Sequence, residues 1–286
     1  MPELPEVETL VQGLKDVLIG RRIVGVELHK PKMWQGKLSD EIKGHVIKDI
    51  TRIAKLMVFS LSGDLKLLIH LKMTGQLIFE DKKGHMLGGG HPDEQFALQQ
   101  PSKYTHIIFS FEDGSKLYFN DMRQFGYAKL ISASELTQHK FVADIGIDPF
   151  VPQFTVDFLH QQLQKRPKIT VKQVLMDQTV IAGIGNIYAD ESLFDAKILP
   201  TRKASAISED ETKELHQSIL KILKKAIDFG GTSYKDFVHH SGKKGTMQDH
   251  LMVYRRAGQK CKRCGGTIKR IIIGGRGTHF CPDCQH

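Results

Sequence analysis

Four cysteines near the carboxyl end constrain this chain more than any other feature. They follow the pattern C-x2-C, sixteen residues, C-x2-C, and are Cys261, Cys264, Cys281 and Cys284. Two such pairs put four thiolates on two tight turns, as in a closed tetrahedral zinc site. The alternatives are two disulfides or free thiols, but no secretory leader is visible, and disulfides are typical of secreted proteins. The spacing therefore predicts one structural zinc ion, which supplies the folding free energy of a module too small to fold by apolar burial.

The chain is basic, and much of its positive charge lies beside these cysteines. Its 286 residues carry a formal net charge of +9. From Arg255 to His286, eight lysines and arginines stand against one acid, Asp283. Such a surface favours a polyanionic partner. No run of about 18 apolar residues is present, so we expect no membrane-spanning segment.

The hydrophobic periods change along the chain. The first residues suit a helical turn, and apolar side chains recur at helical spacing as far as Leu18, before Gly20. Short β-rich segments follow, over residues 22–29, 46–53, 55–61, 65–71, 105–111, 115–121 and 127–131. Beyond Pro149 and Pro152 the periods are helical, over residues 156–164, 171–177, 187–196 and 209–230.

These periods predict an α+β protein. We expect a β-sandwich or barrel, a linker near Pro149, a helical part, and a cysteine-bearing hairpin from about Gly258. Residues 81–102 have no apolar period, and we expect a long surface loop there.

Two glycine-rich turns are candidate phosphate sites. In GGRGTH, Arg276 lies among glycines that let a ligand approach the backbone, although a hairpin turn with a solvated charge explains the pattern slightly better. In AGIGNIYADESLF, Asn186 falls near the start of a helix, where backbone N–H groups can hold a phosphate. A plain helix cap is the alternative there.

Five residues of the β-rich part are candidate functional residues, but each taken alone has a structural explanation. Lys55 begins an apolar strand, and His70 and Met73 stand in HLKMTG. Methionine is usually a core filler, and a lysine at a strand edge is usually solvated. Arg123 and Phe125 share the expected turn of NDMRQFG, where an arginine beside an aromatic residue suits insertion into a base stack.

Together these segments resemble the formamidopyrimidine-DNA glycosylase family. PELPEVET, RIAK, HLKMTG, DMRQFG, LMDQTVIAGIGNIYADESLF and GRGTHFCPDCQ follow the family's order over nearly the whole chain. The resemblance implies a monomeric base-excision repair enzyme of the bacterial cytoplasm, acting at the nucleoid on double-stranded DNA with oxidised bases or abasic sites. It implies a catalytic β-sandwich flanked by helices in residues 1–148, a helix–two-turns–helix domain in 149–240 and a zinc finger in 241–286.

The resemblance also implies roles for single residues. Pro2 is the expected nucleophile once Met1 is removed, Glu3 the general acid, and Lys55 the lysine linked to β-elimination. Arg276 matches the arginine tied to phosphate binding and δ-elimination. The remaining implied site residues are the pocket residue Glu6, the backbone-gripping His70, Lys168 and Asn186, the void-filling Met73, Arg123 and Phe125, and Tyr104, which stands where the family often has a DNA-contacting histidine.

The chemistry of an α-amino group explains why a terminal proline suits this reaction. Its pKa is about 7.7–8.0, so an appreciable fraction is neutral and nucleophilic at cellular pH, unlike lysine near about 10.4. The secondary amine of Pro2 can attack C1′ of the deoxyribose, displace the damaged base and leave an iminium. Glu3 is covalently adjacent and can move protons to the sugar.

Two alternatives remain. An endonuclease VIII-like enzyme for oxidised pyrimidines keeps the fold, but its terminus usually reads PEGPE, so Leu4 argues against it. A non-catalytic DNA-binding protein with a zinc ribbon has no need for Pro2, Glu3 and Lys55 together. Covalent trapping on lesion-bearing DNA separates it from the enzymes.

Overall fold

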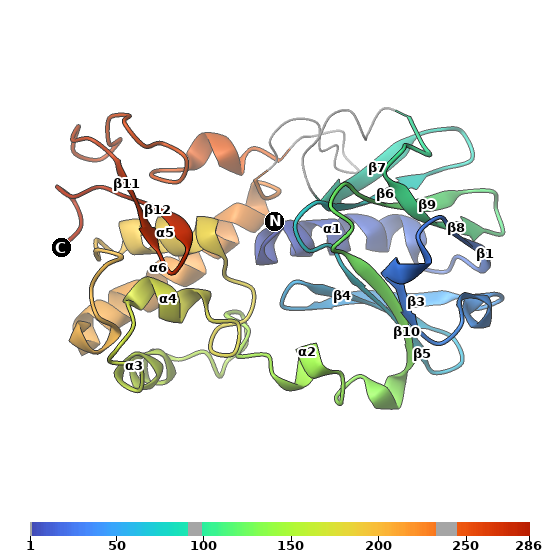
Figure 1. The fold of residues 1–286 in the computed structure, drawn as a ribbon, viewed down its shortest axis with the longest axis horizontal. Coiled ribbons are helices and arrows are strands. Elements are labelled where there is room, and N and C mark those ends of the chain that lie inside the picture. Colours follow the sequence, from blue (N-terminus) through green and yellow to red (C-terminus); the bar gives the residue numbers. More distant parts are fainter. Residues whose placement is uncertain (1, 91–98, 233–244) are drawn as a thin grey trace. The chain divides into compact units, whose positions relative to one another are not determined.

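A computed structural model describes residues 2–90, 99–232 and 245–286 (Figure 1). The described chain has mixed helices and strands, so the predicted α+β class is confirmed. It divides into two compact units. The first contains residues 1–143 and 229–248, and the second contains residues 144–228 and 249–286. The chain therefore passes from the first unit to the second, returns to the first at residue 229, and ends in the second with the cysteine-bearing segment.

Among the described residues, the first unit contains two five-stranded sheets. One has the order β1–β8–β9–β6–β7, with antiparallel neighbours, and the other the order β2–β10–β5–β4–β3, in which only β2 and β10 are parallel. The strands are β1 (Ile23–Leu28), β2 (Trp34–Gly36), β3 (Ile47–Ile53), β4 (Leu56–Leu61), β5 (Leu65–His70), β6 (Gly75–Glu80), β7 (Met86–Gly90), β8 (Thr105–Phe111), β9 (Lys116–Asp121) and β10 (Tyr127–Ser132). All seven β-rich segments named from the sequence are strands, whereas β2, β6 and β7 were not expected.

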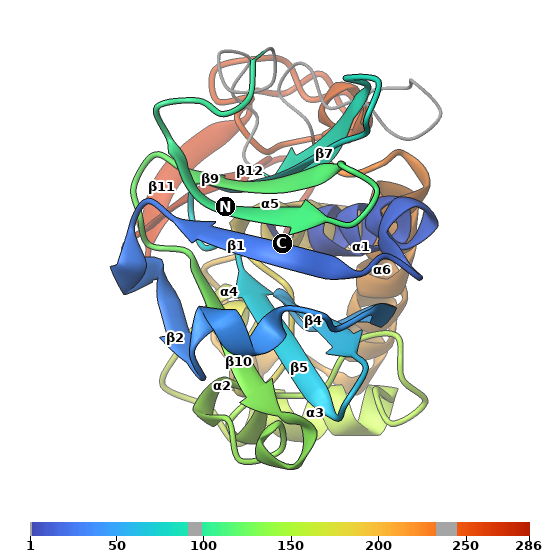
Figure 2. The same ribbon diagram turned by 90° about the vertical axis from the view of Figure 1, so that its right-hand side faces the viewer.

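Helix α1 (Leu4–Leu18) closes one side of this sandwich. It contacts β3 and β7, which are the edge strands of the two different sheets. Figure 2 shows the two layers of strands with α1 alongside them. The helix buries the stripe predicted from its period, with Val7, Leu10, Val11 and Leu14 at most 2% exposed. Burying such side chains contributes about 1.5–3 kcal/mol each, so this stripe fixes the start of the chain against the strands.

Strand β7 corrects the expectation of a surface loop over residues 81–102. Residues 86–90 pair with β6, and Leu87 packs against the core, while residues 91–98 lie outside the described residues. A Cβ on Gly88 would lie 2.4 Å from the carbonyl oxygen of Leu77, and a Cβ on Gly90 would lie 2.2 Å from that of Gly75. The β6 backbone comes so close that only glycine fits at these two positions. Because glycine has no side chain, β7 lacks the alternation of apolar and polar residues by which a strand is recognised in a sequence.

The second unit is helical and ends in a hairpin. Its helices are α3 (Val156–Gln164), α4 (Val171–Met176), α5 (Asn186–Asp195) and α6 (Glu209–Asp228), and the hairpin pairs β11 (Lys269–Ile273) with β12 (Arg276–Phe280); the short α2 (Lys140–Ala143) belongs to the first unit. The four predicted helical segments and the hairpin are therefore present. Thr155 and Thr170 cap α3 and α4 by accepting backbone N–H bonds. Within the described ranges, no helix is long and apolar enough to cross a membrane.

Candidate active site and nucleic-acid interface

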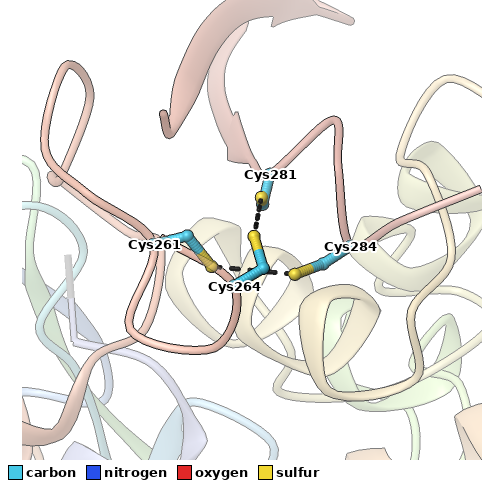
Figure 3. Close-up of side chains that lie close together, drawn as sticks. All are labelled: Cys261, Cys264, Cys281 and Cys284. Carbon is cyan, nitrogen blue, oxygen red and sulfur yellow. Dashed lines mark hydrogen bonds between the residues drawn. The ribbon is translucent and has the colours of Figure 1, made fainter. Parts of the chain in front are cut away.

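The four cysteines converge on one point in the second unit (Figure 3). Their sulfur atoms all lie within 4.8 Å of one another, with 3.7 Å between Cys261 and Cys284 and 3.6 Å between Cys264 and Cys281. A tetrahedron of Zn–S bonds of about 2.3 Å has S···S edges of about 3.8 Å, so the cluster fits a zinc ion. The predicted structural zinc site is confirmed, and disulfides are excluded by these separations.

The backbone around the cysteines supports thiolate ligands. The N–H of Arg263 donates to Sγ of Cys261 and the N–H of Gly266 to Sγ of Cys264, both at 3.4 Å. Cys261 and Cys281 are buried beside Phe194 of α5. Hydrogen bonds to the sulfur atoms favour the charged form that a metal requires.

A buried carboxylate joins this module to α5. Glu191 accepts backbone N–H bonds from Met252, Val253 and Tyr254 at 2.8, 2.9 and 2.8 Å. Burial raises its pKa, and the three N–H bonds act in the opposite direction. The sequence analysis missed this residue, because a glutamate in a helix gives no local sign that it will be buried against a distant segment.

The tip of the hairpin is built by two glycines. Gly274 and Gly275 have φ of +55° and +73° and connect the paired residues Ile273 and Arg276. Two consecutive left-handed residues form a type I′ turn, which suits the twist of a two-stranded ribbon. Arg276 is the first residue of β12 and is exposed, so its guanidinium is accessible at the hairpin tip.

A buried network connects this hairpin to α4 and α5. Lys172 is fully buried, and its Nζ donates to Oδ1 of Asp190 at 2.6 Å, Oγ1 of Thr278 at 2.7 Å and Oδ1 of Asn186 at 2.7 Å. The other oxygen of Asp190 accepts the backbone N–H of His279 at 2.8 Å. A buried ammonium with three acceptors is satisfied, so this network holds three segments in register.

The network fixes the position of Asn186. This residue is the first of α5, after the N-cap Gly185, and its Nδ2 donates to the carbonyl oxygen of Gly277 at 2.9 Å. Its amide therefore ties the helix start to the hairpin, while a contact to DNA stays a prediction. Lys168, chosen from the sequence, is exposed before α4, and its carbonyl oxygen accepts from Lys203. Sequence reasoning missed Lys172, which looks like a surface lysine in VKQVLM.

The amino-terminal residues are buried in the first unit. Pro2 is buried and Glu3 is 3% exposed. The N–H of Glu3 donates to Oε2 of Glu6 at 2.9 Å, which fixes the start of α1. Oε1 of Glu6 accepts from the N–H and Oγ1 of Thr232 at 2.8 and 2.9 Å. Glu6 thus joins the terminus to the segment that follows α6, while Met1 lies outside the described residues.

Lys55 and His70 lie at neighbouring strand ends in the same unit. Lys55 is 5% exposed and stands in the two-residue turn between β3 and β4, after Ala54 with φ of +53°. Leu56, the next residue, pairs with His70. Burial, and the positive charges of Lys72 and Lys55, lower the pKa of His70 to about 3. His70 is therefore neutral, and because its Nδ1 accepts the N–H of Lys72 at 3.0 Å, its proton is on Nε2.

Buried Asp121 organises the loop that carries Arg123 and Phe125. Its Oδ1 accepts from Oγ1 of Thr74 and from the N–H of Arg123, and its Oδ2 accepts from the N–H of Gly126. Oγ1 of Thr74 also accepts from the N–H of Arg123 at 3.0 Å. These bonds tie the loop to the turn between β5 and β6, where Met73 lies.

The side chains of this loop face solvent. Phe125 is 55% exposed, and the guanidinium carbon of Arg123 lies 4.7 Å from its ring centroid. Tyr104 is half-buried nearby, and its carbonyl oxygen accepts from the N–H of Asp121 at 2.9 Å. The trio named from the sequence therefore stands on two turns bonded to each other, and its insertion into a base stack stays a prediction.

The first unit buries Pro2 and Lys55, and the second unit carries a cationic zinc hairpin. These features are the ones expected of a zinc-finger DNA glycosylase. Sequence models of three domains match the chain. They are the formamidopyrimidine-DNA glycosylase N-terminal domain over residues 1–128, its H2TH domain over 145–238, and the zinc finger found in FPG and IleRS over 258–286. The chain belongs to the formamidopyrimidine-DNA glycosylase family.

Individual relatives are similar to this chain over nearly their full length. The formamidopyrimidine-DNA glycosylases of Shouchella clausii and Pelotomaculum thermopropionicum are 39% and 38% identical, each over 100% of this chain and 99% of the relative. A Lactococcus lactis Fpg in complex with abasic-site DNA is similar in structure, with a TM-score of 0.87, 34% identity and 99% of both chains covered. A complex of the same protein with DNA containing Fapy-dG has a TM-score of 0.86 and 35% identity, over 99% of this chain and 100% of that one.

The predicted enzyme class is confirmed by these matches. The protein is a DNA glycosylase with AP lyase activity that acts on oxidised purines in base-excision repair, and its partner is DNA. The roles of individual site residues, the monomeric state and the three domain boundaries stay predictions.

Proposed function

We propose that this enzyme excises 8-oxoguanine and formamidopyrimidines through a covalent intermediate at Pro2. Its nitrogen forms a bond to C1′ while the bond from C1′ to the damaged base breaks, which leaves an iminium. Loss of the acidified C2′ proton then expels the 3′ phosphate, and a second elimination expels the 5′ phosphate. Water then hydrolyses the bond between Pro2 and the sugar remnant, which frees the amine. The products are the free base, the unsaturated sugar fragment and a one-nucleotide gap with phosphate ends.

The burial of Pro2 and Glu3 at the start of α1 is the observation that carries this proposal. Desolvation disfavours the charged form of an amine, so a low-dielectric position at the start of α1 suits the amine that removal of Met1 would create at Pro2. Glu3 can move protons to the sugar, and Lys55 can assist β-elimination. Arg276 binds a phosphate and supports δ-elimination, while the zinc ion, held by the four cysteines, supplies structure rather than chemistry.

Base flipping is the step assigned to the exposed loop. A base must leave the stack to be reached, at a cost of a few kcal/mol. Met73, Arg123 and Phe125 fill the space it leaves, and His70, Lys168, Asn186 and Tyr104 contact the bent backbone. Glu6 lies at the lesion pocket, where its bonds to Thr232 support its position.

The proposed organisation follows the family. Residues 1–148 form the catalytic domain, residues 149–240 the helix–two-turns–helix domain and residues 241–286 the zinc finger. The family matches over 1–128, 145–238 and 258–286 support this division. The relatives named above are bacterial, which supports action at the nucleoid in the cytoplasm, by a monomer.

Borohydride trapping tests the covalent step. The full chain is incubated with duplexes that each carry one lesion, and adducts and cut products are separated on denaturing gels. We expect mass spectrometry to show loss of Met1, a trapped adduct that maps to Pro2, and faster cleavage at 8-oxoguanine opposite cytosine than at thymine glycol or dihydrouracil. Full activity with Met1 retained contradicts the Pro2 mechanism, and faster pyrimidine cleavage supports the endonuclease VIII-like alternative.

A further inference from the structure

The sheet that contains β4, β5 and β10 buries apolar side chains on both of its faces. One face belongs to the main core of the first unit. The opposite, outer face carries a smaller cluster, formed by Leu56, Val58, Leu68 and Ile131. Three side chains of the segment 136–142, which includes part of α2, pack against this outer cluster, namely Leu136, Phe141 and Val142. The segment therefore covers the outer face of the sheet just before the chain passes into the second unit at residue 144.

His70 lies at the end of this outer face. It pairs with Leu56 in β4 and with Tyr127 in β10, and residues directly opposite each other in antiparallel strands share a face. The ring centroid of Phe141 lies 5.3 Å from that of the imidazole, with the two planes at 89°, and the ring of Tyr127 lies 5.9 Å away at 36°. Edge-to-face pairs prefer centroid separations of about 4.5–7 Å, so the contact with Phe141 is favourable.

The two rings and one hydrogen bond fix the orientation of the imidazole. The N–H of Lys72 donates to Nδ1 of His70 at 3.0 Å, so Nε2 carries the proton. The side chain is 5% exposed, and no described residue accepts a hydrogen bond from Nε2. This N–H is therefore the donor that His70 can offer to a ligand. Truncation of Phe141 would remove one wall of the site, so that the imidazole could rotate and gain water.

We propose that Phe141 is a positioning residue for His70. Its ring holds the imidazole in the one orientation that offers the N–H at Nε2 to the DNA backbone. The proposal rests on the backbone contact proposed above for His70. Phe141 acts through His70 and needs no contact with DNA of its own, so the segment 136–142 contributes to DNA binding by packing alone.

The groups that face the imidazole keep it uncharged at the pH of the cell. Lys55 acts on it from the turn between β3 and β4, and Lys72 from the turn that follows β5, and both disfavour a second proton, as burial does. Tyr127 faces it from β10, and because burial raises the pKa of this phenol, it stays neutral too. Phe141 adds an apolar surface from α2. The bond that His70 donates is therefore independent of pH only while the ring is covered.

Binding measurements test the role of Phe141. The affinity of the full chain for a duplex with a tetrahydrofuran abasic analogue is measured at about pH 7.5 for the wild type, Phe141→Ala and Leu136→Ala. Leu136 is the matched control, because it packs against the same outer cluster but has no ring. We expect Phe141→Ala to lower the affinity roughly two- to tenfold, which is the range that an aromatic pair contributes, and Leu136→Ala to leave it unchanged.

A double-mutant cycle shows whether Phe141 acts through His70. In the His70→Gln background, Phe141→Ala should have no further effect on affinity. Equal weakening in both backgrounds overturns the positioning role. Wild-type affinity of His70→Gln overturns the backbone contact on which the proposal rests. Borohydride trapping on lesion DNA is measured in parallel, so that failure of the reaction proposed at Pro2 is seen separately from either result.

Titration of His70 in the absence of DNA gives an independent readout. NMR signals of the histidine Hε1 protons are followed from about pH 4.5 to 8, and His70→Gln identifies the signal of His70. We expect this signal not to titrate in the wild type or in Leu136→Ala. In Phe141→Ala its midpoint should move toward the ordinary value of about 6.5, because the imidazole gains water.

A milder variant keeps the test decisive if Phe141→Ala does not fold. Phe141→Leu retains an apolar side chain but loses the ring, so we expect the same changes in affinity and titration with a smaller amplitude. An unchanged His70 signal in a folded Phe141 variant, or equal changes in that variant and Leu136→Ala, overturns the positioning role.

Discussion

Nζ of Lys172 lies 2.6 Å from Oδ1 of Asp190, and both side chains are at most 1% exposed. The pair joins α4 to α5, and each partner reaches further, Lys172 to Thr278 and Asp190 to the N–H of His279. A buried charge left without its partner is costly, so this pair holds the zinc hairpin against the helices only while both members are present.

Removal of one partner should therefore destabilise the second unit strongly. Lys172→Met leaves the Asp190 carboxylate buried without its cation, and we expect a loss of about 3–5 kcal/mol in the free energy of unfolding. Urea denaturation followed by far-UV circular dichroism measures it. The control is Lys221→Met, which breaks the exposed Lys221–Asp195 pair and should cost about 1 kcal/mol or less. Similar losses in the two variants would contradict the role of the buried network.

Loss of one cysteine ligand should remove the metal and weaken DNA binding. In Cys281→Ser the buried thiolate is replaced by a poorer ligand, so we expect loss of zinc, local unfolding of the hairpin and weaker binding, with the first unit still folded. Metal analysis, DNA titration and the fluorescence of Trp34 in the first unit report these three effects. Pro282→Ala alters the same turn without removing a ligand and should keep its zinc. Normal DNA binding by zinc-free protein would disprove the structural role.

Two single variants should distinguish residues that bind DNA from residues that act in the reaction. Arg276→Ala should lower DNA affinity and reduce its salt slope by about 0.9, because one phosphate contact is lost. Lys55→Ala should slow cleavage of an 8-oxoguanine duplex more than it weakens binding, because the role proposed for this buried lysine is in the elimination step on the sugar adduct. Single-turnover rates and binding curves measure the two effects. Equal losses of affinity, with no separate loss of rate, would count against both assignments.

The loop that carries Arg123 and Phe125 should affect the excision rate most when the lesion is stacked in a duplex. Phe125→Ala removes an exposed ring worth about 1–3 kcal/mol of stacking on a base, so we expect excision from duplex DNA to fall roughly tenfold or more. A lesion placed in an unpaired bubble should be excised at nearly the wild-type rate. Met122→Ala changes the neighbouring exposed residue and serves as the control. An equal fall on both substrates would place the effect of Phe125 outside base flipping.

The neutral state of His70 should make stability depend on pH. Its pKa of about 3 in the folded protein lies below the ordinary value of about 6.5, so only the unfolded chain gains a proton between these values. Stability is then lost as the pH falls from 6.5, by up to about 1.4 kcal/mol per pH unit. His70→Gln should lack this part of the slope between pH 7 and 4.5, whereas His29→Gln, at an exposed site, should keep it. Identical slopes for the wild type and His70→Gln would contradict a buried neutral imidazole.

Local features of the sequence determined the metal site, the helices and most strands. Zinc ligands often come in pairs separated by two residues on a tight turn, so Cys261 and Cys264 can be recognised as ligands without any knowledge of the fold. The apolar stripe of α1 and the β-rich segments are likewise short-range patterns, and the resemblance to a family supplied the roles of Pro2 and Lys55, which no pattern reveals.

Only the tertiary structure decided which polar residues are structural. Lys172 and Thr278 are 106 positions apart, and Asn186 and Gly277 are 91 apart, so their bonds leave no periodic trace in the sequence. Gly88 and Gly90 look like loop residues until the backbone of β6 lies against them. The spacing of apolar side chains along a helix or strand indicates which of its faces is buried. It does not indicate which distant residues pack against that face. For that reason the burial of Lys172 and the presence of strand β7 become evident only when the chain is folded.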